Sequence, residues 1–177
     1  AEVPAALQGL SRRLQARDTL LGSHDDTDAT ANALARGLGA MICEFPETKA
    51  AAEAAATTQR SVVLGAPNVV RGGSHNGNVS AADLARRNLC AALASDYHYP
   101  SLRFAALALA KDIGLARAWG LISSGPACIL GLSDRGSLEI GMRGDFVVLD
   151  PDSQRVMATF AKGRPSYLTG AVAERFL

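Results

Sequence analysis

Side chains that could bind a metal or an anion gather at four points of the chain, each after a short apolar segment. They are His24 with Asp25, Glu44, the glycine-rich stretch 65–78, and Asp96. A neutral imidazole and a carboxylate suit Zn²⁺, Mn²⁺ or Fe²⁺, so we expect His24 and Asp96 to bind a divalent metal, with zinc the first choice. The alternative for His24 is a structural hydrogen bond to Asp25 or a capping role at the next helix.

The stretch from Gly65 to Asn78 is expected to be a long loop between a strand and a helix. Its fourteen positions hold four glycines, three asparagines, one arginine, one serine and one histidine. Glycine lets the backbone approach a ligand closely, and the planar fork of arginine suits phosphate or carboxylate. We therefore expect an anionic substrate here, bound by Asn68, Arg71, Ser74, His75 and Asn78. The alternative is a solvated loop tip, where such residues are common.

Two carboxylates complete the expected substrate-binding set. Glu44 lies between Cys43 and Phe45 in an apolar segment, where a carboxylate is costly unless it is paired, and this favours a functional role. Asp25 is the second, although it could instead be a charge stabilised at a helix N-terminus.

The apolar segments predict an α/β fold. Expected strands at 18–23, 40–45, 61–65 and 89–94 are followed by expected helices at 29–38, 47–60, 80–88 and 100–111. Short, continuously apolar strands that alternate with helices are typical of a parallel sheet. All four polar clusters then lie at the C-terminal ends of strands, where such folds bind ligands. Two short helices, near 115–123 and 126–130, and a turn-rich β segment after residue 131 complete the chain.

Composition excludes several classes of function. The chain has 177 residues and a net charge of +1, with no basic run interleaved with aromatics, so we expect no nucleic-acid partner. No apolar run reaches the roughly 20 residues of a membrane span, so we expect no membrane partner.

Cys43, Cys90 and Cys128 lie in apolar stretches and are expected to be buried free thiols, which fits the cytoplasm. The chain opens without Met inside a helical pattern, which predicts a fragment of a longer protein.

Four segments carry a resemblance to a known family: Ser23–Thr27, Glu44–Thr48, Gly65–Asn78 and Ser95–Tyr97. Their order resembles the phosphonate-metabolism branch of the amidohydrolase superfamily, the α-D-ribose 1-methylphosphonate 5-triphosphate diphosphatases. The segment 131–145 is similar to the return to the β domain in many amidohydrolases. The resemblance covers nearly the whole chain.

The resemblance implies a metal-dependent hydrolase with a (β/α)8 TIM barrel. This chain would be the C-terminal half, with strands five to eight and C-terminal helices in residues 1–130. Residues 131–177 would form the C-terminal part of a small β-sandwich.

The resemblance also implies roles for single residues. His24 matches the strand-five metal histidine, and Asp96 matches the strand-eight aspartate that contacts metal and acts as the catalytic base toward water. Glu44 stands where strand six usually carries a histidine. The implied reaction is release of pyrophosphate from a phosphorylated ribose, with Arg71 on the polyphosphate.

Two other interpretations remain open. One is an amidohydrolase that acts on a C–N bond, as a deaminase or cyclic amidase, against which the Arg71 loop argues. The other is a non-catalytic half-barrel module. A half-barrel exposes strand edges and an apolar face, so we expect it to pair with the missing N-terminal half or to self-associate.

Overall fold

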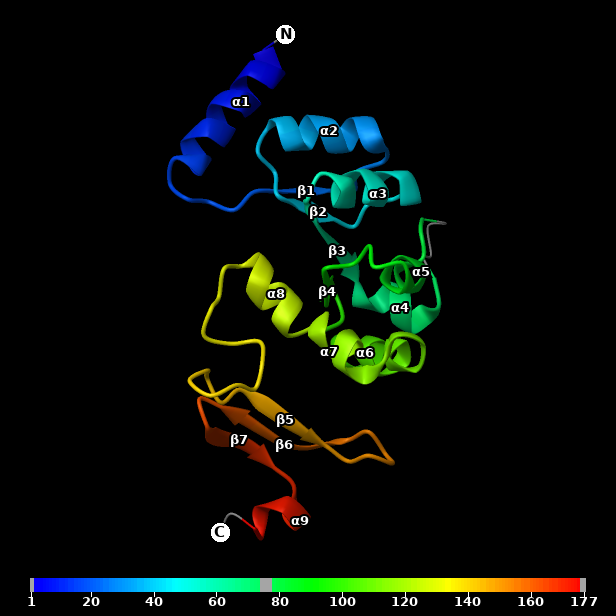
Figure 1. Ribbon diagram of the computed structural model, residues 1–177, viewed down its shortest axis with the longest axis vertical. Helices are drawn as coiled ribbons and strands as arrows, with labels where there is room; N and C mark the ends of the chain where they lie inside the picture. The colour runs from blue at the N-terminus through cyan, green and yellow to red at the C-terminus, as the bar shows by residue number, and fades with distance from the viewer. Residues whose placement is uncertain (1, 74–77, 176–177) are drawn as a thin grey trace.

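The computed structural model describes residues 2–73 and 78–175 as a mixed α/β structure with two sheets (Figure 1). The first sheet is parallel and contains β1 (Gly22–His24), β2 (Ile42–Glu44), β3 (Ser61–Gly65) and β4 (Ala92–Ala94). Its helices are α1 (Glu2–Gln15), α2 (Ala29–Gly37), α3 (Lys49–Thr57), α4 (Ala66–Arg71), α5 (Ala81–Arg86) and α6 (Ser101–Ile113). Then come α7 (Leu115–Gly120), α8 (Ser124–Ile129), the antiparallel strands β5 (Phe146–Leu149), β6 (Val156–Ala161) and β7 (Arg164–Leu168), and α9 (Gly170–Ala173).

The parallel sheet keeps its strands in chain order, β1-β2-β3-β4. The register pairs His24 with Glu44, Glu44 with Val63, and Val63 with Ala92. Because every connection contains a helix, each strand lies parallel to the one before it, as the sequence predicts. The carboxyl ends of all four strands therefore meet at one edge.

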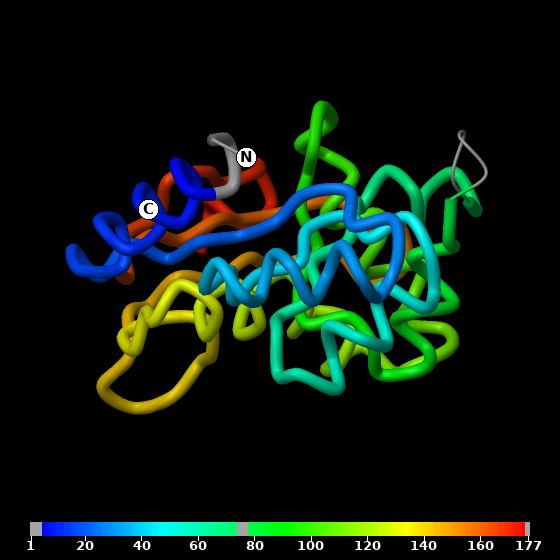
Figure 2. Tube along the Cα trace, turned by 90° about the horizontal axis from the view of Figure 1, so that it is seen from above, coloured from blue at the N-terminus to red at the C-terminus, as the bar shows by residue number. Residues whose placement is uncertain are grey.

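The two faces of this sheet differ in what covers them. Alternate residues such as Cys43, Val62, Leu64 and Leu93 are buried in one hydrophobic core beneath the helices. Leu109 of α6 is among the most deeply buried members of that core. Figures 1 and 2 show α4 to α6 on this side of the strands and α8 on the other side.

The opposite face of the sheet is more open. His24, Glu44, Val63 and Ala94 line a cavity of about 530 Å³ there, together with Pro126 and its neighbours in α8. The short helix α8 packs against this face, and the side chains of His24 and Glu44 remain partly exposed.

Side-chain caps fix the starts of α2, α3 and α5. The Asp28 side chain accepts hydrogen bonds from the backbone N–H groups of Thr30 and Ala31 at the start of α2. Thr48 and Ser80 do the same for α3 and α5. Each cap satisfies backbone donors that have no partner within their own helix, so each fixes where the helix begins.

The second sheet has the order β5-β6-β7 and is antiparallel. Phe146 and Phe160 stack across β5 and β6 with ring centroids 4.4 Å apart. The prediction of a small β segment after residue 131 is confirmed, but β7 and α9 were not foreseen. Pro165 obscured β7, because proline is tolerated in a strand mainly when that strand lies at a sheet edge, as here.

Two other expectations need correction. The supposed loop after β3 begins as the helix α4, because Pro67 fits a first helical turn and Gly72 ends the helix in the left-handed conformation at φ 79°. Cys128 is exposed rather than buried, whereas Cys43 is buried and Cys90 intermediate; all three are free thiols. Within residues 2–73 and 78–175, no helix is long and apolar enough to cross a membrane.

The close approach of α8 to the sheet depends on Gly125. A Cβ atom there would lie 2.1 Å from the carbonyl oxygen of Ala91, a backbone atom that cannot rotate away. We expect Gly125→Ala to lower the free energy of unfolding by about 1–3 kcal/mol, measured by denaturant titration. The control is Gly37→Ala, because nothing lies within 4 Å of its Cβ position; it should be neutral or stabilising by up to about 1 kcal/mol. Equal effects would contradict the proposed packing of α8.

Candidate functional site

The carboxyl edge of the parallel sheet is marked by unusual backbone geometry. Asp25, Phe45 and Asp96 follow β1, β2 and β4, and have φ angles of 58°, 53° and 52°. The left-handed region is uncommon for non-glycine residues, above all for one as large as Phe. Backbone bonds from Asp25 N–H to Glu44 O and from Phe45 N–H to Val63 O hold two of these turns. Such conformations cost about 1–3 kcal/mol each and cluster at functional sites.

His24 lies at this edge with carboxylates on both ring nitrogens. Its Nδ1 is 2.9 Å from an Asp25 carboxylate oxygen, and its Nε2 is 3.8 Å from Glu44 Oε2. The Phe45 ring packs edge-on against the imidazole at 5.2 Å. The side chain of His24 is 56% exposed, so one side of the ring remains open to a ligand.

A polar pocket of about 180 Å³ brings together five of the residues expected to form the site. They are Asp25, Asn68, Arg71, Asn78 and Asp96. They come from the turns after β1 and β4, from α4 and from the segment before α5. Residues distant in sequence therefore meet where the strand-end argument places them.

The other expected residues lie elsewhere. His24 and Glu44 line the neighbouring cavity on the open face of the sheet rather than this pocket. Ser74 and His75 lie outside the described residues. The desolvation argument for Glu44 is wrong, because its side chain is 40% exposed and has solvent and His24 beside it.

Asn68 makes contacts that organise the loop. Its amide nitrogen donates to Val79 O at 3.2 Å, and its carbonyl oxygen accepts from Ala81 N–H at 3.0 Å. Val79 N–H in turn donates to Glu47 O at 3.0 Å. These bonds hold the return of the loop against α4 and the β2–α3 turn. A direct contact of Asn68 with substrate stays a prediction.

Arg71, the last residue of α4, reaches across to the turn after β4. Its guanidinium donates a hydrogen bond to the Tyr97 hydroxyl and lies 5.7 Å from the centre of the Tyr97 ring. Both groups are exposed, and the pair lies beside Asp96, which lines the pocket with Arg71. The sequence interpretation selected Arg71 and gave Tyr97 no role.

The chain's own residues fit a metal only in part. A metal-bound histidine usually donates its second ring N–H to a carboxylate, which is the arrangement of His24 Nδ1 with Asp25. Yet no group of three or more His, Cys, Asp or Glu residues in the described parts of the chain could hold a metal ion. His24 suits a ligand through Nε2, but further ligands would have to come from outside these residues.

A buried charge network lies on the helix side of the same turn. The Asp26 and Arg60 side chains are 5% and 0% exposed, and Arg60 Nη1 is 3.1 Å from Asp26 Oδ2. Ser23 Oγ and Asn32 Nδ2 donate to the same carboxylate oxygen at 2.9 Å and 3.0 Å. Arg60 also donates to Ile42 O at 2.7 Å and to Ser23 Oγ. Arg60 Nε finds no acceptor in the parts of the chain that are described.

This network sets the ionisation of its members. Burial alone would raise the pKa of Asp26, but hydrogen bonds from Ser23, Cys43 and Arg60, with the Arg60 charge, lower the pKa below its ordinary value. The Cys43 thiol donates to Asp26 at 3.3 Å, and burial together with that carboxylate raises its pKa to about 12. Asp26 therefore stays ionised while Cys43 stays a neutral thiol. The sequence analysis did not predict this network. The feature that could have indicated it is Arg60, a charged residue directly before a buried strand.

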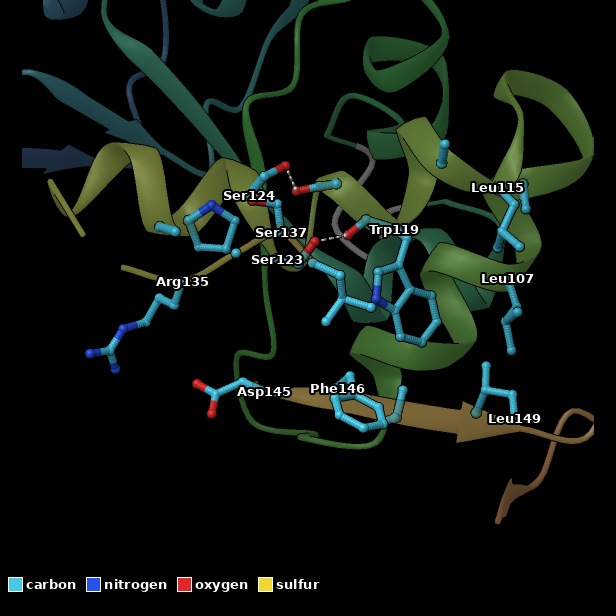
Figure 3. A pocket seen from close by; sticks show the side chains of 18 of the residues that line it. Leu107, Leu115, Trp119, Ser123, Ser124, Arg135, Ser137, Asp145, Phe146 and Leu149 are labelled. Atoms are coloured by element: carbon cyan, nitrogen blue, oxygen red, sulfur yellow. Dashed lines mark hydrogen bonds between the residues drawn. The ribbon is translucent and has the colours of Figure 1, made fainter. Parts of the chain in front are cut away.

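A larger cavity, of about 1310 Å³, lies away from this edge, between α6–α8 and β5. Figure 3 shows Trp119 of α7 and Phe146 of β5 facing it, with leucines around them. Two of its charged members are engaged in ion pairs, since Arg135 pairs with Asp134 at 2.7 Å and Asp145 with Arg143 at 2.9 Å. Mostly apolar walls without convergent polar groups indicate a packing surface rather than a catalytic site.

No family model matches the chain. It is 42% identical, over 145 residues, to the α-D-ribose 1-methylphosphonate 5-triphosphate diphosphatase of Escherichia coli (strain K12). The match covers 80% of this chain and 38% of that protein, so the chain spans less than half of its curated relative. This confirms the resemblance seen in the motifs.

Solved structures share the fold. A crystal structure of an amidohydrolase aligns with a TM-score of 0.71 at 15% identity, covering 94% of this chain and 49% of its own. A prolidase complexed with N-methylphosphonate-L-proline aligns with a TM-score of 0.67 at 19% identity, covering 96% and 50%. The chain thus corresponds in fold to about half of these proteins.

Removal of Arg60 should leave an uncompensated buried charge. We expect Arg60→Met to lower the free energy of unfolding by about 3–5 kcal/mol, measured by denaturant titration. The double variant Asp26→Asn/Arg60→Met should recover part of that loss, because no unpaired charge remains. The control is Arg86→Met, whose half-exposed ion pairs with Asp83 and Asp112 should contribute little to stability because solvent screens them. A loss at Arg60 no larger than at Arg86 would show that the buried pair does not stabilise the turn.

Proposed function

We propose that this chain, a relative of the α-D-ribose 1-methylphosphonate 5-triphosphate diphosphatases, forms part of a metal-dependent hydrolase that releases pyrophosphate from that triphosphate. The observation that carries the proposal is the pocket where Arg71, Asn78, Asp25 and Asp96 meet at the carboxyl edge of the sheet. The sequence identity to the diphosphatase of Escherichia coli supports the substrate class.

The proposed architecture is half of a (β/α)8 barrel, with β1–β4 as strands five to eight and residues 131–177 as part of a β-sandwich. In-order parallel strands with helices on one face support it, because a barrel has this arrangement throughout. The open face of the sheet would then look into the barrel. The edges of β1 and β4 would pair with strands that this chain does not supply.

In this proposal Arg71 and Asn78 bind the triphosphate. The guanidinium of Arg71 offers donors in a planar fork that matches phosphate oxygens, and its charge offsets theirs. Asn78 adds a neutral donor at the same pocket. Asp25 orients the His24 imidazole through Nδ1.

Asp96 is the proposed general base. No hydrogen bond or ion pair engages its carboxylate among the described residues, so it can accept a proton from water. That water attacks the phosphorus bonded to the ribose 5-oxygen. The bond from this phosphorus to the bridging oxygen breaks, and pyrophosphate leaves while a 5-phosphate remains.

A divalent metal would offset charge on the phosphoryl oxygens and help to ionise water. His24 and Asp96 are the residues of this chain that we propose to hold it, with zinc first and manganese or iron as alternatives. The remaining ligands would belong to the other half of the barrel.

The proposed partner of this chain is that other half. Leu138 and Ile140 are highly exposed, and exposed apolar residues surround the large cavity beside β5. Exposed apolar surface of this kind is usually covered in the functional state. Self-association of the chain is the alternative way to cover it.

Arg71 should be required for the reaction. In the complete protein we expect Arg71→Ala to lower kcat/KM for the triphosphate by about 100-fold, because a charged donor to the phosphoryl group is lost. Arg71→Lys should recover only part, since an ammonium lacks the planar fork. The assay is pyrophosphate release, and the control is Arg87→Ala, an exposed arginine outside the pocket. Unchanged triphosphate hydrolysis in Arg71→Ala, or turnover of C–N substrates instead, would contradict the assignment.

The 177-residue chain by itself should be inactive. It carries the proposed base and phosphate donors but lacks a set of three metal-binding side chains among its described residues. The test is pyrophosphate release by the purified chain with added Zn²⁺ or Mn²⁺, beside the complete protein as positive control. Measurable turnover by the chain would overturn the half-barrel proposal.

A further inference from the structure

We infer that Tyr97 is a second phosphate-binding residue of this site, which acts with Arg71 as a clamp on the polyphosphate of the substrate. The inference rests on the proposed function and adds a residue to which the sequence analysis assigned no role. Its chemical target is a phosphate oxygen near the mouth of the pocket.

Tyr97 lies next to the polar pocket. It directly follows Asp96, which lines that pocket, and it belongs to the turn after β4. Arg71 ends α4, which follows β3. Figure 2 shows the green segment after β4 projecting from the body on the side where α4 ends. The two side chains thus join separate strand-end segments across the pocket mouth.

The Tyr97 hydroxyl has a proton to donate to a ligand. A phenol hydroxyl can accept one hydrogen bond and donate another. The Tyr97 hydroxyl accepts from Arg71 Nη1, which leaves its own O–H to donate. No acceptor for that proton is found among residues 2–73 and 78–175. A hydroxyl polarised by a guanidinium is a stronger donor, and a phosphate oxygen is the acceptor that the site is built to receive.

Exposure separates this role from simple packing. Tyr97 is 64% exposed, so its ring buries too little surface to stabilise the fold much. The guanidinium lies 5.7 Å from the ring centre, which fixes the ring beside Arg71. Tyr99, two residues later, is 79% exposed and makes no such contact in the described chain, so it is a matched control.

The test compares Tyr97→Phe with Tyr99→Phe in the complete protein. Tyr97→Phe removes the hydroxyl and keeps the ring against Arg71. We expect KM for the triphosphate to rise about 10-fold with kcat changed less than 2-fold, because a hydrogen bond to a charged group is lost in binding. Binding of inorganic tripolyphosphate, measured by calorimetry, should weaken by the same factor. Tyr99→Phe should leave both values unchanged.

The outcomes separate this inference from the proposed function. Unchanged KM and unchanged tripolyphosphate affinity in Tyr97→Phe would overturn the clamp, as would an equal effect in Tyr99→Phe. If the complete protein bound tripolyphosphate through Tyr97 but did not hydrolyse the triphosphate, the clamp would stand and the proposed function would fall. Thermal unfolding of Tyr97→Phe should match wild type, and a large loss of stability would mark the residue as structural instead.

Discussion

The buried ion pair of Asp26 and Arg60 is the constraint on which the candidate site depends. Taking two charges out of water costs several kcal/mol each, and only good geometry with further hydrogen bonds offsets that cost. Here Ser23, Asn32 and the backbone of Ile42 supply those bonds. The network ties the end of β1 to α2, β2 and the start of β3.

This ion pair holds the turn after β1 from the helix side of the sheet. Asp26 is the second residue after His24, and Arg60 binds its carboxylate. The intervening residue, Asp25, adopts a left-handed backbone conformation and turns its carboxylate to the imidazole. The position of the His24 ring therefore depends on a buried network behind the turn that carries it.

Much of the fold could be predicted from the sequence because local rules decided it. Apolar segments that alternate with expected helices located the parallel strands and their helices. The bounds of β3 were predicted to the residue. The edge position of Arg71, Asn78 and Asp96 followed from strand direction alone, and the structure brings these three into one pocket.

What could not be predicted depends on contacts between distant residues. Arg60 can be buried because its guanidinium donates a hydrogen bond to the carboxylate of Asp26, 34 positions earlier. Glu44 appeared buried from its apolar neighbours, but the open face of the sheet exposes it. Nothing in the sequence indicated a role for Tyr97, because its contact with Arg71 depends on where α4 lies.

The polar pocket at the carboxyl edge and the apolar cavity beside β5 have separate linings. The most direct test is a crystal structure of the complete protein with bound pyrophosphate. The account predicts phosphate oxygens in contact with Arg71 and Asn78 at the carboxyl edge of the sheet, next to Asp96. Pyrophosphate bound elsewhere, for instance in the cavity beside Trp119, would contradict it.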